Sequence, residues 1–422
     1  MNFLKQAPAC WLSASLLLAG GSAWAQPQAV EMAASTALPA VTLQTALAQA
    51  MAQNPGLRAA QQAVAASEGA MIQSQARPNP ELAFSQEDTR RATRSSSLQW
   101  NQPIEIGGKR AARMKVAEHG VELARAELDT ARAALRADVR AAFANLLAAQ
   151  QRVQLNEKTL EIAAQARDAA AKRVMAGKAA PLEETKAQVA ESSAQLALNQ
   201  AQSGLRVARQ QLALLWGGFG MAVGEAMGDM VQLPQLPPQE QLLQKVELSA
   251  QVVRAQQAYL QAKSTAELER AKRLPDPTVS VGIKRAEEAG RNQLLLGVSI
   301  PLPILDSNRG NQLQALRLAD KAEDELLAAR QLAQAQLLQN YEQLQTSRAQ
   351  TLQLQSKVLP GAQSAYEVAA KGFSLGKFSY LDVLDAQRTL ADARSLYLDQ
   401  LVATHRAAAE ITRQLGDTPG LE

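Results

Sequence analysis

The stretch FSLGKFSYLDVLDAQ, residues 373–387, places a Gly-Lys turn between two helix-forming sequences and follows it with two aspartates three residues apart. An earlier stretch, VMAGKAAPLEETKAQ at 174–188, contains the same turn, and Gly177 precedes Gly376 by 199 residues. Glycine adopts the left-handed conformation that ends a helix at little cost. The two stretches therefore predict two helical hairpins, each with a Gly-Lys tip.

Other landmarks in the sequence also occur twice. RPNPELAF at 77–84 matches RLPDPTVSV at 273–281, and QPIEIGGKR at 102–110 matches IPLPILDSNR at 300–309. A repeat of nearly 200 residues is too long for a solenoid and indicates a tandem duplication. Each unit is predicted to contain an entry helix, two strands, a very long helix, a turn and a return helix.

The predicted domain boundaries follow from this duplication. A signal peptide at 1–25 precedes the first unit at 26–216, a Gly- and Pro-rich connector occupies 217–241, and the second unit at 242–416 is followed by a tail at 417–422. The predicted elements are an entry helix at about 43–76, strands at about 81–88 and 96–104, a long helix at about 109–175 and a return helix at about 181–216, then strands at about 277–285 and 293–302, a long helix at about 309–375 and a return helix at about 380–415. A helix of some 67 residues is a rod on the order of 100 Å long, which exceeds any compact domain.

The predicted strands alternate between apolar residues and polar or small ones. The apolar positions are Leu82, Phe84, Leu98 and Trp100 in the first unit and Val279, Val281, Ile283, Leu294, Leu296, Val298 and Ile300 in the second. This pattern is typical of a sheet with lipid on one face and water on the other. A small soluble sheet packed on a helix fits the strand pattern equally well.

Composition and charge exclude several classes of protein. Only 4% of the 422 residues are aromatic, and the 44 basic and 40 acidic groups are interspersed, so the chain lacks the basic stripe and stacking aromatics of a nucleic-acid binder. It contains two histidines, His119 and His405, and one cysteine, Cys10, with no catalytic or metal-ligand spacing. The sequence therefore predicts neither an enzyme nor a cofactor.

The N-terminus has the order of parts that an export signal requires. Lys5 supplies a positive charge, residues 11–19 an apolar run, and Ala23-Trp24-Ala25 a small-x-small cleavage site. Because Cys10 lies before the apolar run, it is poorly placed for lipidation.

No other stretch offers the roughly 18 uninterrupted apolar residues that a spanning helix needs. Four strands are also too few to close a membrane barrel, so several copies would have to share one.

The duplication, QPIEIGGKRAAR at 102–113 and GKFSYLDVLDAQ at 376–387 resemble the TolC-like outer-membrane factors over nearly the whole mature chain. Within that family, QPIEIGGKR is most similar to the outer-membrane components of heavy-metal efflux systems of the cobalt-zinc-cadmium type. The resemblance implies a mainly α fold with a small β part. In it, four strands per chain contribute to a shared β-barrel, trimeric and 12-stranded, that continues into a long α-helical coiled-coil periplasmic tunnel.

The resemblance also implies partners and a function. The partners are two further copies in a homotrimer, a periplasmic adaptor (membrane fusion) protein, an inner-membrane RND-type proton-driven pump and the lipid of a Gram-negative outer membrane. The protein would be a passive exit duct in a tripartite system, for heavy-metal cations such as Co, Zn, Cd or Ni. Drug efflux and type I protein secretion are alternatives within the same architecture, and a structural periplasmic coiled coil is a further alternative.

Four groups of candidate site residues follow. Asp382 and Asp385 match the aspartates that ring the tunnel entrance in the family, although a solvated helix face explains most such pairs. The remaining groups are the hairpin tips where the adaptor would dock (Gly177, Lys178, Gly376 and Lys377), a possible entrance latch (Glu183, Phe373 and Phe378) and the barrel-to-tunnel junction (Pro103, Gly107, Gly108 and Pro301). At the junction, proline ends strand pairing because it has no N–H to donate.

Overall fold

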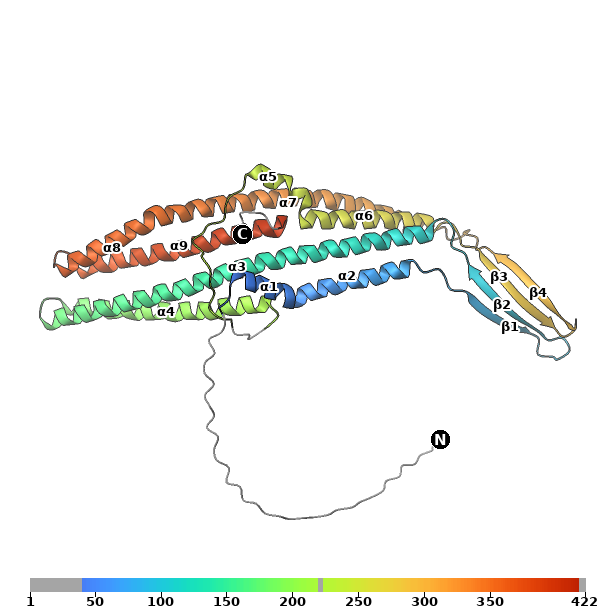
Figure 1. Cartoon of the computed structure of the whole chain (residues 1–422), viewed down its shortest axis with the longest axis horizontal. Helices are drawn as coiled ribbons and strands as arrows, with labels where there is room; N and C mark the ends of the chain where they lie inside the picture. Colours follow the sequence, from blue (N-terminus) through green and yellow to red (C-terminus); the bar gives the residue numbers. More distant parts are fainter. Residues whose placement is uncertain (1–39, 219–222, 417–422) are drawn as a thin grey trace, which may run out of the picture. The chain divides into compact units, whose positions relative to one another are not determined.

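The computed structural model describes residues 40–218 and 223–416. The predicted signal peptide at 1–25 and the tail at 417–422 lie outside these described residues. Most of the described chain is helical, and four strands form a single antiparallel sheet (Figure 1).

Across these same residues, none of the helices combines the length and the apolar character that crossing a membrane requires.

The first repeat begins with two helices separated by Asn54. The Asn54 side chain accepts from the Leu57 N–H at 2.9 Å and donates to the Leu215 carbonyl at 2.9 Å, and Pro55 takes the first helical position. Asparagine caps a helix in this way. The first helical position tolerates proline, because the N–H that proline lacks would have no partner within the helix there. The elements of this repeat are α1 (Leu43–Gln53), α2 (Pro55–Ser74), β1 (Glu81–Glu87), β2 (Ser95–Pro103), α3 (Lys109–Met175) and α4 (Pro181–Leu215).

Helix α3 links the sheet to the first hairpin tip without interruption. Its 67 residues contain no proline, and its buried positions are mostly alanine and leucine. Small side chains allow neighbouring helices to approach closely, and α3 packs against α2, α4, α6 and α9 (Figure 1).

The second long helix differs from the prediction of an uninterrupted helix at 309–375. Helix α7 (Arg309–Gln353) passes through a π-helical turn, η2 (Leu354–Val358), into α8 (Leu359–Ser374). Pro360 supplies the physical reason, because a proline ring clashes with the carbonyl four residues earlier and removes a helical hydrogen bond. The wider π turn, closed by the Leu359 N–H and the Leu354 carbonyl, accommodates it. The other elements of this repeat are α5 (Gln239–Gln244), η1 (Val246–Leu248), α6 (Ala250–Ala271), β3 (Thr278–Ala286), β4 (Arg291–Ser299) and α9 (Tyr380–Leu415).

The two repeats meet in one sheet with strand order β1-β2-β3-β4. Strands β1 and β2 form the hairpin of the first repeat, β3 and β4 that of the second, and β2 pairs with β3 between them. Within this single chain, β1 and β4 are the edge strands.

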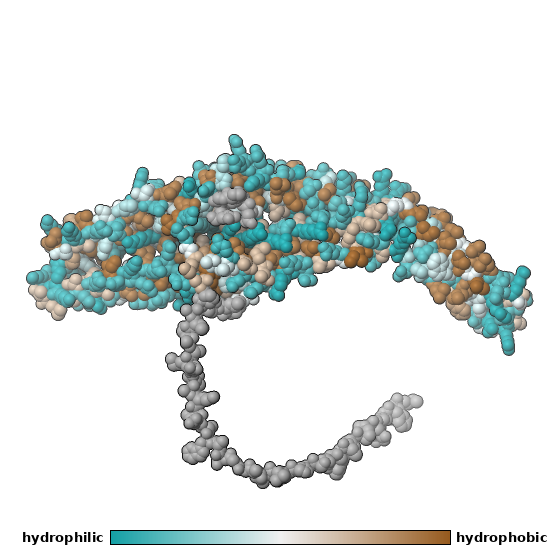
Figure 2. Space-filling view, viewed as in Figure 1, coloured by the Kyte–Doolittle hydropathy of each residue, from teal (hydrophilic) through white to brown (hydrophobic). Residues whose placement is uncertain are grey.

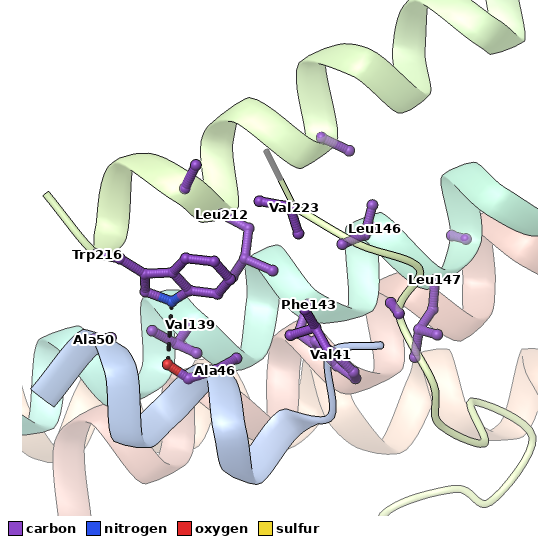
Figure 3. Close-up of a cluster of buried hydrophobic side chains, with 14 of the residues drawn as sticks. Val41, Ala46, Ala50, Val139, Phe143, Leu146, Leu147, Leu212, Trp216 and Val223 are labelled. Carbon is purple, nitrogen blue, oxygen red and sulfur yellow. Dashed lines mark hydrogen bonds between the residues drawn. The ribbon is translucent and has the colours of Figure 1, made fainter. Parts of the chain in front are cut away.

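The largest buried cluster holds α1, α3 and α4 together (Figure 3). Val139, Leu146 and Leu212 are fully buried, and the Trp216 indole N–H donates to the Ala46 carbonyl at 3.1 Å. A buried indole N–H needs such a partner. The Gly- and Pro-rich connector contains no helix between Val223 and Pro238, yet it packs on this cluster through Val223.

Ion pairs join α3 of the first repeat to α9 of the second. Arg413 contacts Asp138 at 2.5 Å, and Arg152 pairs with Asp399. Burial opposes the charged form of Arg413, but Asp138 and Glu410 outweigh it and raise the pKa of the guanidinium. Two long helices from different repeats are therefore fixed side by side.

Candidate functional site

One face of the sheet is apolar across all four strands. The register places Leu82 opposite Trp100, Trp100 opposite Val281, and Val281 opposite Leu296, so these side chains share a face. They are left largely uncovered, since 68% of Leu82 and 73% of Leu296 is exposed. Figure 2 shows apolar residues gathered over the strands, whereas the helices carry a mixture of hydrophilic and apolar residues. An uncovered apolar surface of this kind marks an interaction with lipid or another protein.

Apart from Leu295, which lies opposite Gly282, the opposite face of the sheet is polar or lined by small residues. Ser85 and Ser97 are hydrogen-bonded at 2.8 Å, and Lys284 pairs with Glu87 at 2.9 Å. Gly282 has no side chain, and a Cβ at this position would lie 2.6 Å from the Gln99 side chain. The predicted division into an apolar and a polar or small face is therefore present in the paired strands.

The junction after β2 is held by the second repeat. Beyond Pro103, the Ile104 N–H donates to the Pro277 carbonyl at 2.8 Å, and the Ile106 N–H donates to an Asp276 carboxylate oxygen at 3.0 Å. Asp276 also pairs with Lys109 at 2.8 Å.

Two consecutive glycines then turn the chain into α3. Gly107 and Gly108 have φ values of +72° and +74°, which other residues rarely adopt. A Cβ on Gly107 would also lie 2.6 Å from Leu274. On the second repeat, the turn into α7 after Pro301 uses Asn308, with φ of 59°.

Arg113 ties the start of α3 to the end of α2. Its guanidinium forms a two-pronged contact with Glu105, with the longer distance at 3.1 Å, and donates to the Ser74 and Ala76 carbonyls at 3.0 and 2.9 Å. The hydrogen bond from Arg113 lowers the pKa of the Glu105 carboxyl despite an opposing effect of burial. Arg113 was not predicted from the sequence as a site residue, although it lies in QPIEIGGKRAAR, which carried part of the resemblance.

Both hairpin tips have the same backbone geometry. At the first, the Lys178 N–H donates to the Arg173 carbonyl and the Gly177 N–H to the Val174 carbonyl, both at 2.9 Å. At the second, the N–H of Lys377 donates to the Gly372 carbonyl at 2.8 Å, and that of Gly376 to the Phe373 carbonyl at 2.9 Å. This is the Schellman arrangement, in which a left-handed residue, here Gly177 (φ +65°) or Gly376 (φ +74°), ends the helix. Lys178 and Lys377 are exposed at the two tips.

Replacing Gly376 by alanine is expected to destabilise the second tip by about 1 kcal/mol, because an L side chain is strained at this φ although the space around it is open. Gly361→Ala is the matched control, since Gly361 lies within α8 with open space around it and alanine favours a helix by about 0.5–1 kcal/mol. Hydrogen exchange of the α8–α9 turn should increase in the first variant only. Equal exchange in both variants would contradict the role of Gly376.

The two hairpins contact each other through an aromatic cluster near their tips. The Arg173 guanidinium of α3 lies 4.8 Å from the ring centroid of Phe373 on α8, and the Phe373 and Tyr380 rings are 6.0 Å apart. Tyr380 is buried with Ala170 and Ala187 of the first hairpin. Burial raises the pKa of the Tyr380 hydroxyl. The hairpins are therefore joined by cation–π and apolar contacts.

Only one of the three predicted latch residues takes part in this contact. Phe373 does, whereas the Phe378 ring covers Gly372 of its own hairpin, where a Cβ would lie 2.0 Å from it. Among the described residues, no hydrogen bond or ion pair joins Glu183 to the second hairpin. The contact of Arg173 was not predicted from the sequence, because basic residues are common in the last turn of any helix.

Asp382 and Asp385 are exposed on the first turns of α9. At 100° per residue they lie away from Tyr380 and Leu384, which face the aromatic cluster. Asp382 also has a structural role, because its carboxylate accepts from the N–H and hydroxyl of Ser379, both at 2.8 Å, in a capping box. The Ser379 hydrogen bonds lower the pKa of Asp382, so the carboxylate is charged at neutral pH.

The described residues contain no group of three or more His, Cys, Asp or Glu side chains poised to hold a metal ion.

Comparison with known proteins identifies the family. The family model described as outer membrane efflux protein matches residues 46–218 and 242–417, one match for each repeat. The chain belongs to this family. It is therefore an outer-membrane efflux channel component and not an enzyme.

Two further comparisons agree with this membership. The chain is 46% identical over 376 residues to the cobalt-zinc-cadmium resistance protein CzcC of Cupriavidus metallidurans. The aligned region covers 89% of this chain and 90% of that protein. Its fold is that of a membrane protein from Pseudomonas aeruginosa (TM-score 0.76, 19% identity, 89% and 93% of the two chains). It is also that of the outer membrane protein VceC from Vibrio cholerae (TM-score 0.73, 17% identity, 90% and 97%). The fold predicted from the resemblance, that of an outer-membrane factor, is confirmed.

Proposed function

We propose that this channel is the outer-membrane exit duct of a tripartite efflux system for heavy-metal cations. Three copies form one channel, whose strands face the lipid with the apolar side of the sheet and whose long helices continue as a tunnel into the periplasm. A periplasmic adaptor docks at the hairpin tips, and an inner-membrane RND-type pump supplies the cations. A cleaved signal peptide without lipidation directs export.

The 46% identity to CzcC supports metal cations as the transported substrate, because that relative is named for resistance to cobalt, zinc and cadmium. The uncovered apolar face of the sheet supports contact with lipid, since each chain leaves two strand edges and a whole apolar face unpartnered. A duct that only conducts cations needs no coordinating side chains, and selection of the metal then belongs to the pump and adaptor.

The experiment that tests this function is complementation in a strain that lacks its metal-efflux outer-membrane component. The gene, expressed with its cognate pump and adaptor, should restore growth in zinc, cobalt or cadmium. Drug and detergent tolerance, measured in parallel, tests drug efflux. Restored drug tolerance without restored metal tolerance would contradict the proposed substrate class.

Asp382 and Asp385 are proposed to give the tunnel entrance a negative potential. Repeated by symmetry around an axis, such carboxylates raise the local concentration of cations. Asp385→Asn should lower the cation-to-anion permeability ratio of the reconstituted channel by about twofold, and the double variant Asp382→Asn with Asp385→Asn by more. Because Asp385 is not part of the cap, its variant changes charge and leaves the Ser379 contacts intact.

The control for this measurement is Asp320→Asn, which removes the same single negative charge from α7, far along the chain from the tip. Reversal potentials in a salt gradient provide the readout. If both aspartate variants retain the parental permeability ratio and the parental block by multivalent cations, the two residues do not form a cation-selective entrance.

A further inference from the structure

The apolar stripe of β4 continues beyond the end of the strand. It begins at Leu294, and the alternate residues that follow the strand, Ile300 and Leu302, are 55% and 74% exposed. A strand that crosses a membrane needs about 9–11 residues. The part of β4 from Leu294 to its last residue, Ser299, is shorter than this, and the stripe reaches that length only when Leu302 is included. The surface proposed to face lipid therefore extends past the sheet.

The segment beyond the strand has few backbone N–H groups that need a partner. Pro301 and Pro303 have no N–H, and the Ile304 N–H donates to the Leu302 carbonyl at 2.9 Å. An unpaired backbone group is costly in a membrane, where water is scarce. Alternate prolines lower this cost, so the segment can lie at the edge of a membrane without belonging to a sheet.

A cavity of about 760 Å³ separates this segment from the end of α6. One wall is the apolar segment 302–305, in which Leu302 is the least exposed leucine or isoleucine, and the other contains Lys272 and Arg273. Asn308 joins the two walls, because its side-chain amide donates to the Glu269 carbonyl at 3.0 Å and to the Glu269 carboxylate at 2.9 Å. The cavity therefore combines an apolar wall with a basic one.

The basic wall retains donors for an anion. Lys272 pairs with Glu269 at 2.6 Å, but about half of its side chain is exposed. Among the residues that the structure describes, none forms an ion pair or hydrogen bond with the Arg273 guanidinium. Asp306, the acidic residue of the lining, accepts from the Asn308 N–H at 2.9 Å. Basic residues are common at the end of a helix, but these two border an exposed apolar surface.

We propose that this cavity binds an anionic phospholipid. The phosphate contacts Arg273 and Lys272, and the acyl chains lie along Leu302 and Ile304. A guanidinium can hold a phosphate through two parallel N–H bonds, and basic residues beside an apolar surface attract anionic lipids. Because the cavity lies where the sheet meets the helices, the lipid belongs to the leaflet on the helical side. The inference rests on the proposed function, since it requires the apolar face of the sheet to lie in the membrane.

Native mass spectrometry of the oligomeric full chain tests the basic wall. The chain is purified in detergent and supplied with phosphatidylglycerol or with phosphatidylcholine of the same acyl chains. The parental channel should retain phosphatidylglycerol at least about threefold more, and Arg273→Gln should remove most of this preference while the Lys272–Glu269 pair remains. Arg317→Gln is the matched control, because it removes one positive charge from an exposed position of α7.

A second variant tests the apolar wall. Leu302→Ser should lower the retention of both lipids at least about twofold, because it shortens the surface that the acyl chains cover. Leu313→Ser, at a position 57% exposed on α7, is its matched control and should retain both lipids as the parental channel does.

Two results would overturn the lipid site and leave the proposed channel standing. One is equal retention of the two lipids by the parental channel, or a preference that Arg273→Gln leaves unchanged. The other is an oligomer that Leu302→Ser dissociates and Leu313→Ser does not, with lipid retention per copy unchanged, since another copy would then cover the segment. A parental chain that is monomeric and retains neither lipid would overturn the proposed function itself.

Discussion

Replacing Leu296 by arginine should sharply reduce the amount of assembled channel in the outer membrane. Leu296 is 73% exposed at the middle of the apolar face, where the proposed function places lipid. An arginine facing the centre of a bilayer costs about 2–4 kcal/mol for each chain. The measurement is the heat-modifiable oligomer recovered from outer membranes after carbonate washing, which should fall at least about tenfold.

The neighbouring substitution, Leu295→Arg, is the matched control. Leu295 lies opposite Gly282 on the polar face, so the same side chain added there enters water. Assembly should remain near the parental level. If both variants assemble normally, or if both fail equally, the apolar face does not contact lipid.

Replacing Arg113 by alanine is expected to lower the free energy of unfolding by about 2–4 kcal/mol, because it removes several charge-assisted hydrogen bonds and leaves Glu105 unpaired. The Glu105 side chain is only 13% exposed, so water compensates poorly. Arg113→Lys should recover only part of the loss, since lysine lacks the planar fork. Denaturant or thermal melting in detergent provides the measurement.

Arg125→Ala serves as the control for position and charge. Arg125 lies on the same helix, but its ion pairs with Glu68 and Glu122 are about half exposed, and exposed pairs contribute about 0–1 kcal/mol. If Arg125→Ala lowers the free energy of unfolding as much as Arg113→Ala does, the contacts of Arg113 at the junction stabilise the protein no more than an exposed ion pair.

The Arg113–Glu105 pair also predicts a dependence on pH. Because Arg113 lowers the pKa of Glu105 in the folded state, the pair stabilises the protein above the ordinary glutamate pKa, and this stabilisation is lost as the pH falls through the folded value. The difference in melting temperature between the parental chain and Glu105→Gln should therefore shrink below about pH 4. A difference that stays constant from pH 7 to pH 3 would contradict this assignment.

Much of the fold could be predicted from the sequence because its signals are local and repeated. The Gly-Lys turns mark hairpin tips since only glycine ends a helix there without strain, and the alternation of strands such as ELAFSQE identifies their two faces. The π turn at Leu354–Val358 was not predicted. Pro360 was the available signal, but whether a proline breaks a helix or is absorbed depends on the backbone around it.

The candidate site was less predictable, because its contacts join residues far apart in the chain. Phe373 and the charged face of Asp382 and Asp385 were predicted from the sequence. The packing of Arg173 against Phe373 across the two hairpins was not. The part of Asp382 in the helix cap was likewise overlooked, although Ser379 three residues earlier is the usual signature. Such pairings become visible only when the register of one hairpin on the other is known.

Single-channel recording of the purified full chain in planar lipid bilayers tests the central claim most directly, that copies of this chain share one membrane wall around a water-filled duct. The expected result is discrete conductance steps from the oligomeric fraction, absent from the same fraction of Leu296→Arg. An oligomer that inserts without any conductance, or a preparation that is monomeric and never associates with lipid, would contradict it.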